Sequence, residues 1–246
     1  DAKLDRLWYV GLCYFKKIME MGDAFATALA LIVNFEQGLT EIVLLSFQVS
    51  LVAVAFACLI GLPIGAALAI FKFPGRIVIT VILNAMMGLP PVVVGLIVYL
   101  MLSRSGPLGT LGLLYTPTAM ILAQICLVTP IIAALTRQTT EDLWHEYAEH
   151  LRSLGIGPWR SIITLLWDNR FSLITTVLAG FGRASAEVGA VMIVGGNIDH
   201  VTRVMTTSIA LETSKGNLAL ALGLGIILLV LALGVNAGAF LLIDAA

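Results

Sequence analysis

IVLLSFQVSLVAVAFACLIGLPIGAALAIF, residues 42–71, is a run of thirty residues without a charged side chain. A helix of about 20 apolar residues is long enough to cross the hydrocarbon core of a bilayer. The whole chain has the same character, since 59% of its 246 residues are hydrophobic and only 12% are charged. In lipid, a single segment satisfies its own backbone hydrogen bonds only as a helix. The sequence therefore predicts an all-α integral membrane protein.

Four more apolar runs of spanning length follow, at residues 77–102, 118–135, 171–194 and 218–243. Together with the first run they predict a bundle of five helices, which forms one transmembrane domain over residues 41–246. Residues 1–40 are predicted to be an N-terminal tail with a short apolar segment, AFATALALIVNF. That segment is too short to span, so it either lies along the interface or extends the first helix.

Cations in the connections between the runs predict the orientation of the chain. The first and third connections hold six cations, Lys72, Arg76, Arg137, Arg152, Arg160 and Arg170. The second and fourth hold three, Arg104, Arg203 and Lys215. Because cytoplasmic loops are enriched in cations, this bias predicts an outer N-terminus and a cytoplasmic C-terminus. The four cations of the tail, Lys3, Arg6, Lys16 and Lys17, would cancel the bias if they were counted outside.

Several classes of function have no support in the sequence. No basic run with interleaved aromatic residues is present, so nucleic acid is not predicted as a partner. The three cysteines, Cys13, Cys58 and Cys126, are isolated from one another and from any cluster of histidines. They are interpreted as small apolar residues, and neither a disulfide nor a metal site is predicted.

The third connection, residues 136–170, predicts a compact cytoplasmic structure. An amphipathic pattern runs from Glu141 to Leu154, with apolar residues on one stripe and acids between them. Gly155 and Gly157 interrupt it, and Pro158 suits the first turn of a new helix. We call this predicted pair of helices, which begins at Glu141 and runs through Pro158 to Leu166, the knob. On this pattern alone the knob either contacts a partner or merely caps the bundle.

A pair of opposite charges lies in the fourth apolar run. Arg183 and Glu187 are four residues apart, and Arg183 lies roughly 18 Å from the start of the run at 1.5 Å per residue. Charge at that depth is costly, so both side chains should face the bundle interior or a watery path. Gly182, Ala186 and Ala190 predict a small-residue stripe for close helix packing. The pair has two interpretations that remain open, helix packing or recognition of an anion on the path.

Proline and glycine mark other special positions in the runs. Pro90 and Pro91 predict a kink or a local break in the second run, with a gate as a further interpretation, and Pro63 and Pro130 are interpreted likewise as kinks. The stretch Gly195, Gly196 and Asn197 is interpreted as a helix cap.

Three stretches of the sequence resemble a known family. EHLRSLGIGPW, residues 149–159, resembles the EAA loop of binding-protein-dependent ABC importer permeases. Glu149, Gly155 and the pair Pro158–Trp159 match that pattern, whereas His150 and Leu151 replace its two alanines and Asp168 stands near a usual proline. GLPPVVVGLIVYLMLSRSGPLG (88–109) and FGRASAEVGAVMIVGGN (181–197) resemble the oxyanion branch, and the second is closest to tungstate permeases.

This resemblance implies a five-helix type I permease of the plasma (inner) membrane of a prokaryote. It implies a homodimer that works with two cytoplasmic ABC ATPase subunits and an extracytoplasmic oxyanion-binding protein. The residues implied to couple to the ATPase are Glu149, Leu151, Leu154, Gly155, Pro158 and Trp159. Those implied to line the path or its gate are Arg183, Glu187, Gly189, Pro90 and Pro91.

The chain has no GxxxxGK[ST] phosphate loop, so ATP and magnesium are expected in the partner ATPase and no cofactor is expected here. The sequence thus predicts a permease, not an enzyme, for tungstate or molybdate. A sulfate or phosphate permease is the alternative within the family. A secondary anion transporter would need coupling carboxylates or histidines within the helices, and Glu187 alone is thin support for one. A membrane-embedded enzyme would need an intramembrane catalytic cluster, which the sequence lacks.

Overall fold

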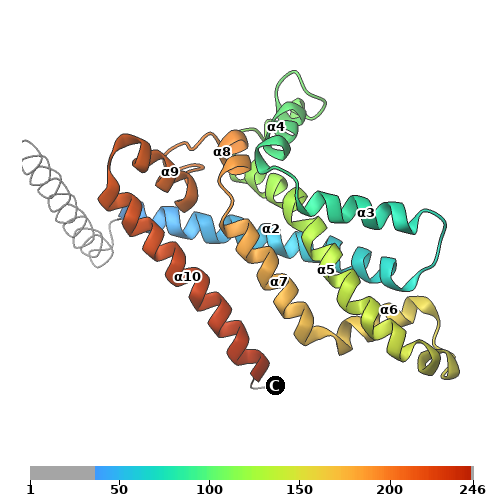
Figure 1. Cartoon of the computed structure of the whole chain (residues 1–246). Helices are drawn as coiled ribbons and strands as arrows, with labels where there is room; N and C mark the ends of the chain where they lie inside the picture. The colour runs from blue at the N-terminus through green and yellow to red at the C-terminus, as the bar shows by residue number, and fades with distance from the viewer. Residues whose placement is uncertain (1–36, 245–246) are drawn as a thin grey trace, which may run out of the picture.

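A computed structural model describes residues 37–244, and the regular structure within this range is entirely helical (Figure 1). The elements are α2 (Gln37–Ile70), α3 (Arg76–Met87), α4 (Pro91–Leu102), η1 (Gly109–Leu111), α5 (Pro117–Ser153), α6 (Pro158–Asp168), α7 (Arg170–Ser185), α8 (Gly189–Gly195), α9 (Met205–Lys215) and α10 (Leu218–Asp244). The predictions for the tail up to residue 36, including its interfacial segment, lie outside the described residues.

Three helices are long and apolar enough to span a membrane, and they lie in α2, α5 and α10. Two bent pairs pass the same test when each is taken as one span: α3 with α4, bent by 102°, and α6 with α7, bent by 77°. The prediction of five spans therefore agrees with the structure only if broken helices are counted as spans. The all-helical class is confirmed.

The prediction of one helix over residues 77–102 is wrong, because the chain breaks between α3 and α4. Pro90 has an extended backbone with φ −62° and ψ 122°, and Pro91 is the first residue of α4. Proline has no N–H to donate to the preceding turn, and it disfavours helical backbone in the residue before it. The local break predicted at Pro90 and Pro91 is thus present. Pro63 and Pro130, in contrast, lie inside α2 and α5 without ending either helix.

The third run and the first half of the knob form one helix, which corrects the predicted boundary at residue 135. Helix α5 continues without a break to Ser153. The reason is chemical: residues 136–153 include no glycine or proline, and their charges mark where the helix leaves the bilayer, not where it ends.

The fourth run, residues 171–194, is also divided, contrary to the prediction of one helix. Helix α7 ends at Ser185, and α8 begins at Gly189 and is only seven residues long. Arg183 and Glu187 therefore lie on either side of a helix end. No proline marks this break, and its cause lies in contacts described below.

The centre of the molecule is the close packing of α2 along α5, which cross one another in Figure 1. Small residues permit the approach. A Cβ built at Gly65 would lie 2.4 Å from the carbonyl oxygen of Ala133, a separation that no side chain tolerates. Val54, Ala57, Val128, Ile132 and Phe181 form a buried cluster that joins α7 to the same pair. Helix α10 runs beside this core with a mostly exposed apolar surface.

Candidate functional site

The turn of the knob is a glycine-dependent helix end. Leu154 caps α5, and Gly155 follows with φ +72°. The N–H of Gly155 donates to the carbonyl of Arg152 at 3.0 Å, and the N–H of Ile156 donates to the carbonyl of Leu151 at 3.0 Å. These two hydrogen bonds define a Schellman motif, in which the residue at positive φ is nearly always glycine. The glycine break predicted in the knob is confirmed.

The knob is packed onto the end of α2 by an apolar cluster. Leu151, Ile162 and Leu165 are buried against Ala66 and Ile70. Leu151 therefore supports the knob from within. Of the other residues predicted to couple, Leu154 is 62% exposed, and Glu149, Gly155 and Pro158 are also exposed. Trp159 is 74% exposed, although one side of its ring lies against Phe71.

An arginine that the sequence analysis used only for orientation joins the knob to two other helices. The Nη2 of Arg76, the first residue of α3, lies 2.5 Å from Oε1 of Glu141 on α5. Arg137 pairs with the other oxygen of that carboxylate. The Nε of Arg76 donates to the carbonyl of Leu68, near the end of α2, at 2.7 Å. The ends of α2, α3 and the extended part of α5 are therefore fixed to one another.

The predicted pairing of Arg183 with Glu187 is present, with 3.1 Å between Nη1 and Oε2. The two partners differ in burial, since the side chain of Glu187 is 3% exposed and that of Arg183 is 31% exposed. The second carboxylate oxygen accepts a hydrogen bond from the N–H of Ala190 at 3.1 Å. Glu187 therefore also caps the start of α8, where a negative charge is favourable.

Two side chains from other helices hold the break between α7 and α8. The Nε2 of Gln124, on α5, donates to the carbonyl of Ala184 at 3.1 Å. The hydroxyl of Thr206, on α9, donates to the carbonyl of Glu187 at 2.9 Å. Thr206 thus satisfies the carbonyl of Glu187, and Gln124 adds a second donor to the carbonyl of Ala184, which also accepts from the N–H of Glu187 at 3.2 Å. Sequence reasoning missed both residues, because a lone glutamine or threonine in an apolar run forms no pattern.

A small cavity of about 30 Å³ lies beside this break. Its polar lining includes Ser50, Gln124, Glu187 and Thr206. The Oε1 of Gln124 is buried and has no hydrogen-bond partner among the described residues. The volume suits one or two waters, which need polar partners of this kind.

Of the three residues in the predicted small-residue stripe, Ala190 contacts another helix among the described residues, whereas Gly182 and Ala186 do not. Ala190 packs directly on α4, because a Cβ built at Gly95 would lie 2.7 Å from the Cα of Ala190. Gly182 has no neighbour within 4 Å of such a Cβ, and Ala186 is exposed. A Cβ built at Gly189 would lie 2.9 Å from Cγ2 of Val92, so the break after Glu187 lies beside the break at Pro90 and Pro91.

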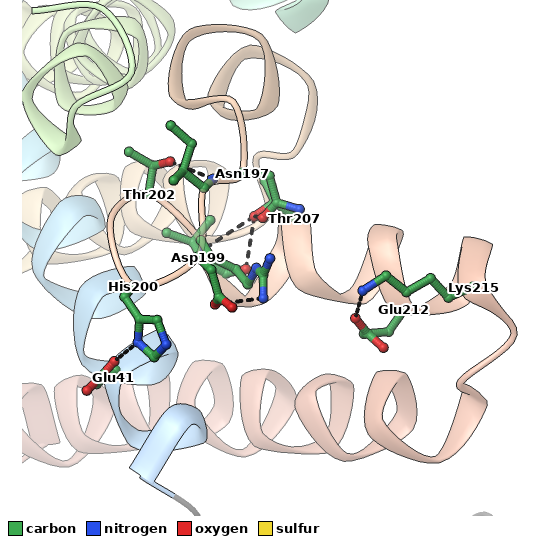
Figure 2. A network of polar contacts seen from close by, with 11 residues as sticks. Glu41, Asn197, Asp199, His200, Thr202, Thr207, Glu212 and Lys215 are labelled. Carbon is green, nitrogen blue, oxygen red and sulfur yellow. Dashed lines mark hydrogen bonds and ion pairs between the residues drawn. The ribbon is translucent and has the colours of Figure 1, made fainter.

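The end of the molecule opposite the knob carries a network of polar contacts, some exposed and some buried (Figure 2). Gly196, with φ +71°, ends α8 as the cap interpretation predicted. In the loop that follows, His200 lies 2.7 Å from Glu41 at the start of α2, and Arg203 pairs with Asp199 at 2.7 Å. The hydrogen bond to Glu41 raises the pKa of His200 above its ordinary value.

Comparison with known proteins finds one matching family model and several similar proteins. A family model described as "Binding-protein-dependent transport system inner membrane component" matches residues 61–243. The "Tungstate uptake system permease protein TupB" of Peptoclostridium acidaminophilum is 41% identical over 197 residues, which cover 80% of this chain and 86% of that protein. The protein of the same name from Campylobacter jejuni is 37% identical over 80% of this chain and 82% of its own length.

A "Probable anion ABC transporter permease protein" of Haloferax volcanii is 42% identical over 204 residues, which cover 81% of this chain and 88% of that protein. Permeases named for molybdenum in Escherichia coli and for sulfate in Synechocystis are each 29% identical, over 69% and 67% of this chain.

Proposed function

This chain belongs to the family of binding-protein-dependent transport system inner membrane components, and from this premise we propose that it is the permease subunit of an ATP-driven importer for tungstate. As a member of that family it is a multi-pass protein of the inner membrane. The observation that carries the substrate is the similarity to two tungstate permeases over four fifths of the chain. Molybdate is the second candidate, because the molybdenum permease is less similar. A sulfate or phosphate permease is the alternative within the family.

The proposal includes partners on both sides of the membrane. Two cytoplasmic ATPase subunits supply ATP hydrolysis with magnesium, a second copy of this chain completes the path, and an extracytoplasmic protein delivers the anion. The turn of the knob suits an ATPase groove, since Glu149, Leu154 and Pro158 project from a glycine end that fixes their backbone. A rigid turn transmits force better than a mobile loop.

Arg183 is the proposed site of anion contact on the path. A guanidinium has five N–H donors in a planar fork that matches an oxyanion. Only Nη1 pairs with Glu187, and the side chain is 31% exposed, so further donors are free to meet a tetrahedral dianion. Glu187 holds the arginine in place and lowers the net charge of the site, which favours release of the anion. A secondary transporter stays a weaker candidate, because Glu187 is already used as a cap and ion-pair partner.

The test is uptake by the reconstituted complex of permease, ATPase and binding protein. We expect ATP-dependent uptake of labelled tungstate, competition by molybdate at higher concentration, and little competition by sulfate. Calorimetry of the binding protein with the three anions gives an independent ranking. Cross-linking in native membranes should yield a dimer of this chain. Uptake without ATP but driven by an ion gradient would contradict the importer, and sulfate uptake preferred over tungstate would contradict the substrate.

A further inference from the structure

Helix α6, the second helix of the knob, has an exposed apolar surface that the turn of the knob does not explain. Trp159, Ile163 and Trp167 are 74%, 72% and 70% exposed. They are four residues apart, so they lie along one side of the helix. We call these three residues the apolar flank. Solvent-exposed tryptophans in a row are rare on surfaces that face water.

The remaining residues of α6 form a buried side and a polar side. Its core side, Ser161, Ile162 and Leu165, is buried against α2 and α5. The adjoining side, about 100° further round the helix, carries Arg160, Thr164 and Asp168, which we call the polar flank. A helix packed by one side onto a bundle thus has an apolar flank and an adjoining polar flank outside that contact.

The direction of α6 relative to α7 indicates what each flank faces. The axis of α6 is bent by 77° from that of α7, which continues into the membrane. With α7 as the membrane-crossing part of this bent pair, the 77° bend directs α6 along the bilayer surface and not across it. A helix in that position has one flank toward the lipid and the other toward the cytoplasm.

Aromatic and basic residues mark this same surface on the neighbouring helices. The ring of Trp159 lies 5.0 Å from that of Phe71, which follows the last residue of α2 and precedes Lys72. The guanidinium of Arg170, at the start of α7, lies 4.5 Å from the ring of Phe171 and 5.4 Å from that of Trp167. Tryptophan and tyrosine collect at membrane interfaces, and arginine and lysine on the cytoplasmic side contact anionic headgroups.

We propose that the apolar flank of α6 inserts into the boundary between headgroups and acyl chains of the cytoplasmic leaflet, with Lys72 and Arg170 at the lipid phosphates. The polar flank then faces the cytoplasm beside the turn that meets the ATPase. The lipid surface would hold the knob at a fixed depth. This inference goes beyond the proposed transport function and rests only on the chain being a membrane protein. The competing occupant of the flank is the ATPase itself.

The test compares cysteines on the two flanks. Cys13, Cys58 and Cys126 are first replaced by serine or alanine, and Ile163→Cys and Asp168→Cys are then made separately in the full chain. Both native side chains are exposed, so neither change disturbs the core. Inverted membrane vesicles are treated with a charged maleimide, with and without the partner ATPase.

We expect the Asp168→Cys variant to react rapidly without ATPase. The Ile163→Cys variant should react at least about tenfold more slowly, because an apolar surrounding that raises a thiol pKa by one unit lowers the reactive thiolate tenfold. Its rate should not change when ATPase is added. Equal rates for the two variants without ATPase would overturn the proposal. So would a fast reaction of Ile163→Cys that the ATPase blocks, since the ATPase would then be the occupant.

A second measurement uses native side chains of the flank. The double variant Trp8→Phe/Trp144→Phe leaves Trp159 and Trp167 as the only tryptophans. In proteoliposomes made of phosphatidylethanolamine and phosphatidylglycerol, acyl chains brominated near the headgroup should quench most of their fluorescence, whereas aqueous iodide should quench little of it. Strong quenching by iodide with none by the brominated lipid would overturn the proposal. Neither measurement requires uptake of any anion, so a wrong substrate assignment would leave both results unaffected.

Discussion

The unequal burial of Arg183 and Glu187 predicts unequal effects of removing each partner. Arg183→Leu leaves a carboxylate that is only 3% exposed without its cation, and breaking a buried pair in this way costs about 3–5 kcal/mol. Glu187→Gln leaves a cation that is 31% exposed and keeps an oxygen for the N–H of Ala190. Its expected cost is about 1.5–3 kcal/mol, the range for one hydrogen bond to a charged group.

The double variant Arg183→Leu/Glu187→Met separates packing from transport. It removes both charges, and apolar residues of similar volume often replace a buried pair at little cost. The remaining loss is the cap on Ala190, about 1 kcal/mol. Thermal unfolding in detergent ranks the variants by stability, since a change of 1 kcal/mol shifts the unfolding midpoint by roughly 2–4 °C for a chain of this size. Arg183→Leu should therefore unfold roughly 6–20 °C below the wild type.

Uptake is measured on the same variants after reconstitution with the ATPase. If Arg183 contacts the anion, the double variant assembles but does not transport, and Arg183→Lys, which keeps the charge and loses the fork, transports partially. A double variant as unstable as Arg183→Leu would refute the argument from burial. Normal uptake by a well-assembled double variant would refute the pathway role and leave helix packing as the function of the pair.

Three further predictions follow from single positions. Gly95→Ala should lower the unfolding midpoint by an amount equivalent to about 1–3 kcal/mol, because its new Cβ meets the backbone of α8. Gly182→Ala is the control: its Cβ enters open space, so the variant should be neutral or slightly stabilising. Equal effects of the two substitutions would contradict the close contact at Gly95. Gly155→Val should abolish both uptake and co-purification of the ATPase. Gly155→Asn should retain both, because asparagine tolerates the φ of +72° at this position. Normal uptake and co-purification by Gly155→Val would contradict the coupling role of the knob. The pKa of His200 is raised in the folded protein, so its contact with Glu41 stabilises the protein fully below about pH 6.5 and is lost as the pH rises through the folded pKa. Glu41→Gln should therefore lower the pKa of His200 measured by NMR. An unchanged pKa would contradict the contact.

Hydrophobic runs and proline were enough to predict the class of fold and one of its two breaks. The length of an apolar run follows directly from the thickness of the bilayer, and Pro90 and Pro91 lack the chemistry to continue a helix. The extension of α5 to Ser153 was not predicted, because charge density reports the solvent around a residue and not its backbone. Absence of glycine and proline was the better signal there.

The candidate site was predicted in part for a similar reason. The spacing of Arg183 and Glu187 predicts their contact on a helix, and the contact is present because the backbone stays helical through Ala186 at the end of α7. The break itself depends on Gln124 and Thr206, which lie far away in the sequence. Such contacts are invisible to local patterns. The same holds for Arg76, whose partners belong to two other helices.

Continuity of α5 links the two candidate sites. One end of this helix carries Leu151 in the core of the knob, and the other part carries Gln124 at the break beside Glu187. The two residues are roughly 40 Å apart along the axis at 1.5 Å per residue. A displacement of the knob therefore reaches the break through one helix, without a loop to absorb it. Pro130 lies between them and lacks an N–H for the preceding turn, so any bend of α5 during transport should occur there.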